Sequence, residues 1–363
     1  MTASRPVTAE PVGPTVIIGA GLVGASVGCA LTAAGWLVHL VDAKASHARV
    51  AAELGAGTVT PAVPEEVRLV VAAVPPRVLP GVISDALRTY PNATVTDVGS
   101  VKAGVLHSLW DSEPELGRYV GSHPMAGSQH SGPMTARADL FVDRTWVITP
   151  HRRSAAAAVD TVRAVVAACR ARPVIMDVDD HDAAVARVSH LPHLMSVLTA
   201  GRLNDIPADD LLLAGQGLRD VTRIAGSDPG LWEQILGSNS GAVLSELRQV
   251  HDQLQVLIKA LEQPETHELR AVLSHGVTGT RRIPGKHGRA AVAYSRVVVQ
   301  IPDEPGALGR LFALVGESGV NVEDIAIEHD QVREVGYLSL SVDPATEAAL
   351  VRAITDRGWT VEP

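Results

Sequence analysis

Short apolar runs alternate with longer amphipathic stretches along the first half of the chain. The runs are rich in Val, Ile and Leu, and they predict strands at residues 15–18, 37–41, 69–73, 94–96, 119–121 and 146–148. Between them, residues 22–34, 46–54, 79–89 and 155–171 have the spacing of helices. Strands that alternate with helices in this way are typical of an α/β domain with a mostly parallel sheet covered on both faces. We assign this domain to residues 15–177.

The strand pattern stops near residue 177. Residues 181–203, 210–225 and 229–261 have only helical spacing, and Ser227 or Asp228 before Pro229 is typical of a helix start. We therefore expect an all-helical substrate and dimerisation domain at 178–275. Residues 276–293 are rich in glycine and basic residues without periodicity, which indicates a linker. Residues 1–14 contain many Pro and Thr residues and predict a disordered tail.

Residues 294–363 carry a third pattern. Strands are predicted at 296–301, 321–328, 335–342 and 359–362, and helices at 307–318 and 346–356. This β-α-β-β-α-β order predicts a small α+β module of the ferredoxin-like kind. The chain therefore contains a Rossmann-like domain, a helical domain and this module.

Composition supports a globular, multidomain protein. The 363 residues are 46% hydrophobic and 20% charged, which suits two or three packed domains. The net charge of −9, which falls mostly in residues 294–363, disfavours nucleic acid or an anionic membrane as a partner. The sequence shows neither an apolar signal segment nor an apolar run of about 18 residues, so we expect a cytoplasmic protein. Cys29 and Cys169 are expected to be buried thiols.

A glycine-rich turn follows the strand predicted at 15–18. Gly19, Gly21 and Gly24 form the pattern G-x-G-x-x-G between this strand and a helix, and that context indicates a dinucleotide site. Gly19 suits a tight turn, Gly21 a close approach of the diphosphate, and Gly24 close packing of helix on strand. The first N–H groups of the helix, beginning at Leu22, then favour the diphosphate.

Asp42 ends the second predicted strand. A carboxylate at this position accepts hydrogen bonds from both ribose hydroxyls and repels a 2′-phosphate, which favours NAD over NADP. Lys44 and Arg49 lie close enough in the sequence to keep NADP open. Val74 and Pro75, which follow the third strand, are further candidates for cofactor binding.

Several segments together resemble the prephenate dehydrogenase family over residues 15–261. They are the glycine loop, Asp97-x-x-Ser100-Val-Lys102, His123-Pro-Met-Ala-Gly127, Ser189-His190-Leu-Pro-His193, and Asp220-x-Thr-Arg223 with Ser227-Asp-Pro-x-x-Trp232. The second and third segments lie at predicted strand ends, where open α/β sheets bind their ligands.

This resemblance implies the oxidative decarboxylation of prephenate to 4-hydroxyphenylpyruvate, on the route to tyrosine. His123 matches the family's catalytic histidine, and a neutral imidazole suits the acceptance of the ring hydroxyl proton. Ser100 matches the hydroxyl that orients the imidazole and the substrate. The chemistry requires no metal, and the sequence shows no third ligand to accompany His190 and His193.

Further residues are expected to hold the substrate. Arg223 matches the family arginine that grips the side-chain carboxylate. Arg219 lies four residues before it on one helix face and is either a second contact or a solvated charge. His190 matches a pocket residue, with a core histidine as the alternative, Trp232 is either a pocket wall or a core tryptophan, and Ser128 is a further contact. Gln129 replaces an acidic residue that is frequent in the family, and a neutral amide favours prephenate over arogenate, which carries an ammonium group.

The segment 297–308 resembles the start of an ACT domain, a module that binds amino acids. The candidate regulatory residues are Asp303, Pro305, Gly306, Ala307, Leu308 and Asn321. The resemblance implies feedback inhibition by tyrosine in a homodimer, whereas a module that only dimerises is the alternative.

Three other functions stay open. Arogenate dehydrogenase and 4-amino-4-deoxyprephenate dehydrogenase are the nearest enzymes. A regulatory protein that senses NAD and an amino acid without catalysis is an alternative of another class. A β-hydroxyacid dehydrogenase is disfavoured because residues 177–225 contain no lysine.

Overall fold

The protein is described here by a computed structural model, in which residues 10–127, 132–262, 267–283, 294–302, 304–330 and 335–362 are described. The chain forms two compact units, Met1–Leu254 and Gln255–Pro363, and each is presented by itself. Three candidate residues, Ser128, Gln129 and Asp303, lie outside the described residues, as do most of the expected tail and linker.

A seven-stranded sheet forms the base of the first unit. Its strands are β1 (Thr15–Ile18), β2 (Val38–Val41), β3 (Leu69–Ala72), β4 (Thr94–Asp97), β5 (Tyr119–Pro124), β6 (Thr145–Thr149) and β7 (Arg172–Ile175). They lie in the order β2-β1-β3-β4-β5-β6-β7. Strands β1 to β5 are parallel, β6 is antiparallel to β5, and β7 is parallel to β6. The mostly parallel sheet is therefore confirmed.

Two strands differ from the sequence prediction. Strand β5 was expected to end at Gly121 but continues to Pro124, because His123 and Pro124 pair with Val147 and Trp146 of the antiparallel β6. Strand β7 was not predicted. It contains a proline at position 173, which weakens the strand signal and is tolerated here because β7 is an edge strand.

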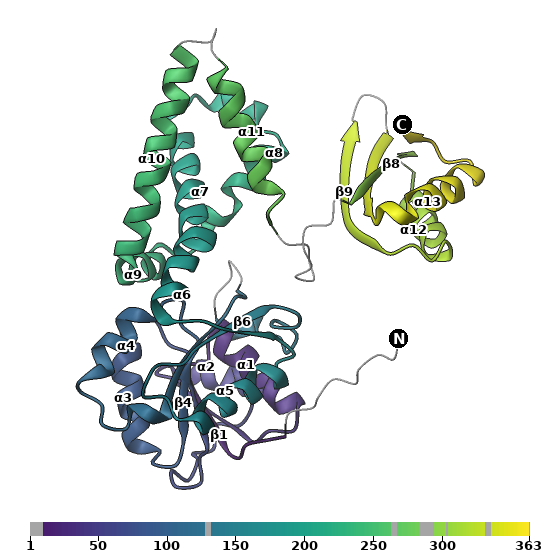
Figure 1. The fold of residues 1–363 in the computed structure, drawn as a ribbon. Helices are drawn as coiled ribbons and strands as arrows, with labels where there is room; N and C mark the ends of the chain where they lie inside the picture. Colours follow the sequence, from purple (N-terminus) through teal and green to yellow (C-terminus); the bar gives the residue numbers. More distant parts are fainter. Residues whose placement is uncertain are drawn as a thin grey trace. The chain divides into compact units, whose positions relative to one another are not determined.

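Helices cover both faces of the sheet (Figure 1). They are α1 (Leu22–Ala33), α2 (Ala45–Glu53), α3 (Leu79–Thr89), α4 (Ala103–Trp110) and α5 (Ala156–Ala168), with short 3-10 turns η1 (Leu116–Arg118) and η2 (Pro133–Thr135). The side chains of β1 alternate between two cores. Ile17 lies in the core that α1, α2 and α5 share, and Val16 in the core under α3 and α4. Cys29 and Cys169 are both buried, as expected, and both are free thiols that form no disulfide.

A helical region follows β7. Its elements are α6 (Val178–Val185), the π-helical turn η3 (Ala186–His190), α7 (Leu191–Arg202), η4 (Leu203–Asp205), η5 (Ala208–Leu213), α8 (Gln216–Thr222), η6 (Arg223–Gly226), α9 (Pro229–Ser238) and α10 (Ser240–Glu262). Asp228 caps α9 by accepting a hydrogen bond from the Leu231 N–H at 2.7 Å. Of the two cap candidates, Asp228 is thus the one used.

The helix from α6 to α7 continues past Pro192, within the stretch 181–203 that was predicted as helical. Proline has no N–H and its ring crowds the carbonyl four residues earlier. The wider π turn at Ala186–His190 lies just before Pro192 and gives its ring room within the helix. Within the described part of the chain, no helix is long and apolar enough to cross a membrane.

The second unit contains α11 (Glu268–Thr280) and a small α+β module. The module consists of β8 (Ser295–Pro302), α12 (Ala307–Glu317), β9 (Val322–Asp330), β10 (Val335–Val342), α13 (Pro344–Asp356) and β11 (Val361–Glu362). Its antiparallel sheet has the order β11-β8-β10-β9 and packs on α12 and α13. The predicted β-α-β-β-α-β order is present. One correction concerns the expected linker, because α11 continues through Gly276 to Thr280.

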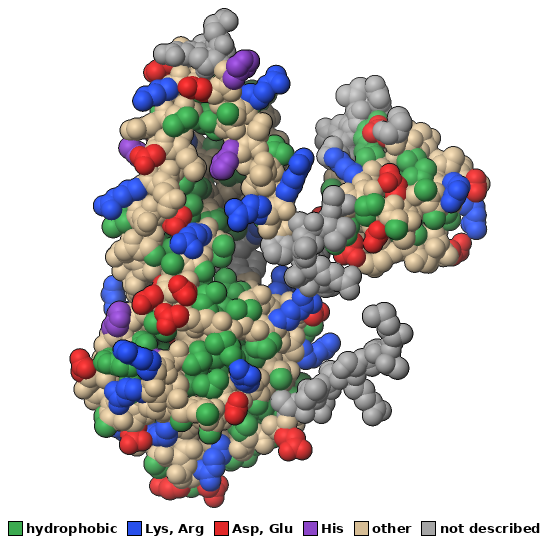
Figure 2. All heavy atoms as spheres, in the orientation of Figure 1, with side chains coloured by type: hydrophobic (Ala, Val, Ile, Leu, Met, Phe, Trp, Pro, Cys, Tyr) green, Lys and Arg blue, Asp and Glu red, His purple; other side chains and the backbone are tan. Residues whose placement is uncertain are grey.

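The visible surface mixes charges of both signs. In Figure 2, acidic and basic side chains alternate with hydrophobic ones over the sheet-containing part of the first unit. No single-signed field of the kind used to bind nucleic acid is visible on this face.

Candidate active site

The glycine loop lies between β1 and α1. Gly19 has a φ of +101°, and a Cβ there would lie 2.2 Å from the Ala73 oxygen. At Gly24 a Cβ would lie 1.9 Å from the Gly19 oxygen, so neither position accepts a side chain. Around Gly21, in contrast, a Cβ would meet no atom within 4 Å. The loop is therefore tightly packed at Gly19 and Gly24 and leaves open space at Gly21, just before α1, as a diphosphate requires.

The carboxylate of Asp42 is fixed beside this loop. It directly follows β2 and accepts hydrogen bonds from the main-chain N–H groups of Ala20 and Lys44, both at 2.7 Å. Val74 comes from the adjacent end of β3, and its Cγ1 would lie 3.1 Å from a Cβ at Gly19. Pro75 follows it and is exposed. These residues fit a bound dinucleotide.

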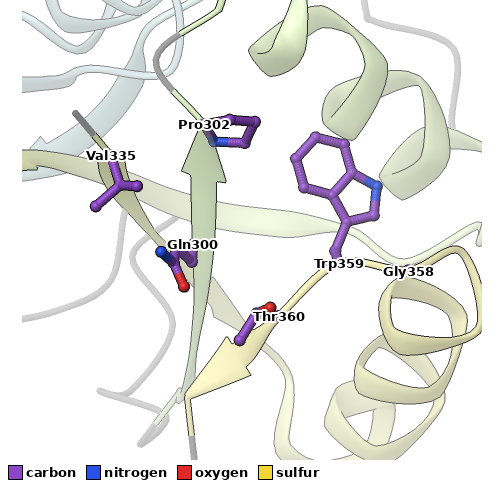
Figure 3. Close-up of a pocket in the computed structure, with 6 residues that line it drawn as sticks. All are labelled: Gln300, Pro302, Val335, Gly358, Trp359 and Thr360. Atoms are coloured by element: carbon purple, nitrogen blue, oxygen red, sulfur yellow. The ribbon is translucent and has the colours of Figure 1, made fainter. Parts of the chain in front are cut away.

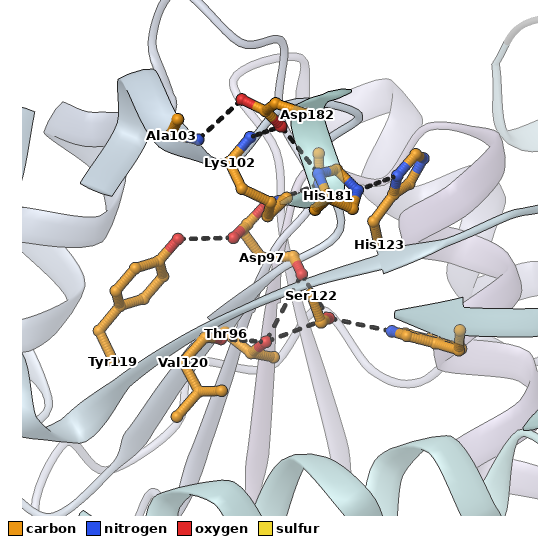
Figure 4. A network of polar contacts seen from close by, with 12 residues as sticks. Thr96, Asp97, Lys102, Ala103, Tyr119, Val120, Ser122, His123, His181 and Asp182 are labelled. Atoms are coloured by element: carbon orange, nitrogen blue, oxygen red, sulfur yellow. Dashed lines mark hydrogen bonds and ion pairs between the residues drawn. The ribbon is translucent and has the colours of Figure 1, made fainter. Parts of the chain in front are cut away.

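His123 lies near the end of β5 and is 9% exposed. Its Nδ1 is 2.9 Å from Nε2 of His181, a fully buried residue of α6 (Figure 4). Burial lowers the pKa of His123 well below its usual value, and the nearby His181, Lys102 and His190 lower it further. His123 is thus a neutral imidazole at neutral pH, as a general base requires.

Asp182 continues this arrangement on the far side of His181. Its Oδ1 lies 2.7 Å from Nδ1 of His181. Its oxygens also accept hydrogen bonds from the main-chain N–H groups of Lys102 and Ala103, both at 2.9 Å, at the start of α4. Burial acts to raise the pKa of Asp182, but the hydrogen bonds from His181, Ala103 and Lys102 outweigh it and hold the pKa below the usual value. Asp182 is therefore a carboxylate.

A buried ion pair fixes the segment that joins β4 to α4. Lys102 and Asp97 are ion-paired and almost completely inaccessible. Asp97 also accepts hydrogen bonds from the Tyr119 hydroxyl and the Gly99 N–H, each at 2.7 Å. Burial, followed by the charge of Asp97, raises the pKa of Tyr119. Ser100 lies on this segment and is partly buried, but among the described residues it makes no hydrogen bond to His123.

His190 belongs to a second group of side chains. Its Nδ1 lies 3.2 Å from Nδ2 of Asn239, and its ring meets Trp232 edge-on with centroids 6.0 Å apart. Trp232 stacks face to face on His193 at 3.5 Å. Burial lowers the pKa of His190 to about 4. Trp232 thus packs against both histidines of the Ser189-His190-Leu-Pro-His193 segment. Among the described residues, no cluster of side chains suits a metal ion.

The two candidate arginines are not joined to the histidines. Arg219 lies on α8 and Arg223 begins η6, and both elements pack against α7. Both arginines are exposed, and neither forms an ion pair within the described residues. They are free cations on the segment that adjoins the His190 helix.

The second unit has an open pocket of about 380 Å³ at one end of its sheet (Figure 3). It is lined by Gln300, Pro302, Val335, Gly358, Trp359 and Thr360. The regulatory candidates Pro305, Gly306, Ala307 and Leu308 follow Pro302 in the chain, and Gly306 has a φ of +83° before α12. Asn321 donates a hydrogen bond to Glu323 at 2.6 Å. None of these candidates lines the pocket.

Two family models match consecutive parts of the chain. The nucleotide-binding domain of prephenate dehydrogenase matches residues 27–175, and the dimerization domain of prephenate dehydrogenase matches residues 177–275. The chain belongs to the prephenate dehydrogenase family. The glycine loop lies just before the first matched residue.

Members of the prephenate dehydrogenase family also resemble the chain as whole proteins. The probable prephenate dehydrogenase NovF of Streptomyces niveus is 33% identical over 95% of this chain and 98% of its own length. The prephenate dehydrogenase of A. aeolicus, solved with hydroxyphenyl propionate and NAD+, has a TM-score of 0.67 and 26% identity over 75% of this chain and 98% of that one. Synechocystis arogenate dehydrogenase has a TM-score of 0.61 and 25% identity over 74% of this chain and 98% of that one.

Sequence reasoning missed three residues of this site. His181, Asp182 and Asn239 lie outside every motif except the helical pattern, yet all three are buried. His181 bonds to His123 and Asn239 to His190, and Asp182 bonds to His181. The adjacent His-Asp pair was the available signal, because charged and titratable side chains are seldom buried without a partner. Asn239 gave no such signal, since it ends α9 and resembles an ordinary helix terminus.

Proposed function

We propose that the chain catalyses the NAD-dependent oxidative decarboxylation of prephenate to 4-hydroxyphenylpyruvate. The observation that carries this proposal is His123, a buried neutral imidazole whose Nδ1 is occupied by His181. Nε2 is then the nitrogen left for a substrate. His123 lies at the end of β5, at the sheet edge where α/β folds bind ligands and where the glycine loop also lies.

The residues can perform the reaction with balanced atoms and electrons. NAD+, when bound, accepts the hydride from the ring carbon that carries the hydroxyl. His123 takes the hydroxyl proton on Nε2, and the electron pair of the O–H bond forms the carbonyl. When CO₂ leaves, the electrons of its bond enter the ring and make it aromatic. The phenolate oxygen then recovers the proton from His123, and no metal or further oxidant is consumed.

The remaining candidates are assigned to substrate and cofactor binding. Arg223 binds the side-chain carboxylate, for which a planar guanidinium is suited, and Arg219 supports it. His190 donates a hydrogen bond from the pocket wall that Trp232 backs. Ser100 provides a hydroxyl near the reacting ring, and Ser128 is proposed from the sequence as a further substrate contact. Gly19, Gly21, Leu22, Gly24, Asp42, Val74 and Pro75 bind NAD.

Prephenate is proposed over arogenate because residue 129 is glutamine. An acidic residue there would attract the ammonium group of arogenate, whereas an amide gives no such attraction. Residue 129 does not discriminate against 4-amino-4-deoxyprephenate, because the amine of that compound replaces the ring hydroxyl and would face His123 instead. NADH formation by the full chain with prephenate and with arogenate tests the proposal. Preference for arogenate contradicts it, and no turnover of either compound favours a sensor without catalysis.

We also propose a homodimer formed through the helical domain. Leu212 and Leu213 of η5 are 84% and 86% exposed, which is unusual for adjacent leucines in a domain of this size. The matched family model for residues 177–275 is that of a dimerization domain. A second copy of this chain is therefore the proposed partner of this apolar segment.

Tyrosine is proposed as an effector bound by residues 294–363. The turn at Pro305 and Gly306 leads into α12, whose first N–H groups suit a carboxylate. The neighbouring pocket of about 380 Å³ offers room for a small ligand. In this proposal the domains are the dinucleotide-binding domain (15–177), the helical domain (178–275) and the regulatory module (294–363).

A further inference from the structure

The hydrogen bonds around Asp182 determine where the ring protons of two histidines lie. Asp182 is a carboxylate, so its oxygens can only accept, and Nδ1 of His181 must donate to Oδ1. A neutral imidazole has one N–H, which leaves a lone pair on Nε2 of His181. Nδ1 of His123, 2.9 Å away, must then donate to that lone pair.

His123 is therefore left with its proton on Nδ1 and a lone pair on Nε2. We propose that His181 and Asp182 are positioning residues that hold His123 in this tautomer, so that Nε2 is free to accept the hydroxyl proton of the substrate. This inference rests on the proposed function. The opposite tautomer has N–H on Nε2 and cannot accept that proton.

The same hydrogen bonds support the protonated state during turnover. When Nε2 of His123 takes the proton and the O–H electron pair forms the carbonyl, the ring becomes an imidazolium. Its Nδ1–H then faces the lone pair of His181, and His181 in turn faces the negative charge of Asp182. After CO₂ leaves, the proton moves from Nε2 to the phenolate oxygen. His123 is then again the neutral Nδ1–H tautomer, and the hydrogen bonds have their original donors and acceptors.

Two other groups, Lys102 and His190, lie near these rings and lower the pKa of His123. Lys102 is ion-paired with Asp97, which also accepts a hydrogen bond from Tyr119. His190 lies on η3. Burial is the main cause of the lowered pKa of His123, and the proximity of His181 is the next.

Two substitutions of one residue separate the two hydrogen bonds of His181. In His181→Asn, the amide nitrogen takes the place of Nδ1 and can still donate to Asp182. The shorter asparagine side chain has no atom in the place of Nε2, so the hydrogen bond to His123 is lost. In His181→Gln, the amide oxygen takes the place of Nε2 and can accept from Nδ1 of His123. The second variant thus keeps the bond that sets the tautomer, and the first loses it.

The readouts are ¹⁵N NMR shifts of the His123 ring and kcat with prephenate. We expect the Nδ1–H tautomer in the wild type and in His181→Gln, with kcat of the latter within a few-fold of the wild type. For His181→Asn we expect loss of this tautomer and a fall in kcat of about 10- to 100-fold. His151→Gln serves as control, because His151 bonds the main-chain oxygen of Tyr119, a contact separate from the His123–His181–Asp182 hydrogen bonds.

Several results overturn the proposal. An Nε2–H tautomer of His123 in the wild type contradicts it directly, even if both variants fail to fold. Unchanged tautomer and kcat in folded His181→Asn also contradict it. Loss of turnover in His181→Gln with the tautomer kept shows that His181 does more than position. If the wild type turns over neither prephenate nor arogenate, the proposed function fails, whereas the NMR signature still decides the tautomer.

Discussion

Nδ2 of Asn239 lies 3.2 Å from Nδ1 of His190. The same nitrogen donates to the main-chain oxygen of Asp182 at 2.8 Å. Because a carbonyl oxygen only accepts, this atom of Asn239 is the amide NH₂, and it has a second hydrogen for His190. His190 therefore accepts on Nδ1 and carries its own proton on Nε2. Asn239 thus prepares His190 as a hydrogen-bond donor, the opposite role from His123.

The first prediction concerns this amide. Asn239→Leu leaves the Asp182 oxygen and Nδ1 of His190 buried without a partner, which should lower the free energy of unfolding by about 1–3 kcal/mol. The KM for prephenate should rise about tenfold, equivalent to about 1.4 kcal/mol of binding. Urea unfolding and steady-state kinetics measure the two effects.

Asn204→Leu is the matched control for that variant. Asn204 is exposed, and its side chain donates a hydrogen bond to the Gly201 oxygen within its own turn. Its replacement should change the free energy of unfolding by less than about 0.5 kcal/mol. An unchanged KM in Asn239→Leu would remove His190 from the proposed substrate site.

Two glycines of the loop should respond differently to alanine. In Gly21→Ala the new Cβ meets no protein atom within 4 Å, so the fold should be kept while NAD binding weakens about tenfold or more. In Gly24→Ala the Cβ lies 1.9 Å from the Gly19 oxygen, so the melting temperature should fall. Thermal melts and NAD titrations distinguish the two. Wild-type NAD affinity in Gly21→Ala speaks against a diphosphate above this residue.

Stability should fall as the pH decreases from about 6.5. In the folded protein His123 has a lowered pKa and His190 a pKa of about 4, whereas unfolded histidines titrate near 6.5. Below about 6.5 the unfolded state therefore binds more protons, and the stability present at higher pH is lost. Urea unfolding at pH values between about 7.5 and 5 measures this slope. His190→Gln should reduce it, and an equal slope in both proteins contradicts the assignment.

Tyrosine should inhibit the full chain through its C-terminal module. A chain ending after Ile283, beyond the last residue of α11, should retain turnover and lose this inhibition. Inhibition is measured at saturating prephenate, where competition at the active site is suppressed. Equal inhibition of both proteins indicates binding at the active site instead.

The sequence predicted those features that depend on local spacing. Strand β10 was placed at its observed bounds, and the glycine loop at its observed position, because apolar alternation and a required turn are local properties. The partners of His123 were not predictable in this way. His181 lies 58 residues from His123, and the two rings meet only because tertiary packing brings α6 and β5 together at this point. The extra length of β5 likewise depends on its pairing with β6.

The function of His123 is tested most directly by its own replacement. Wild type and His123→Asn are compared for NADH formation from prephenate, with 4-hydroxyphenylpyruvate and CO₂ measured as products. Loss of a general base should lower kcat by about 10²- to 10⁴-fold, and NAD affinity should stay within a few-fold. We predict equal amounts of NADH and 4-hydroxyphenylpyruvate from the wild type and almost none from the variant. Wild-type kcat in a folded His123→Asn protein would contradict the account.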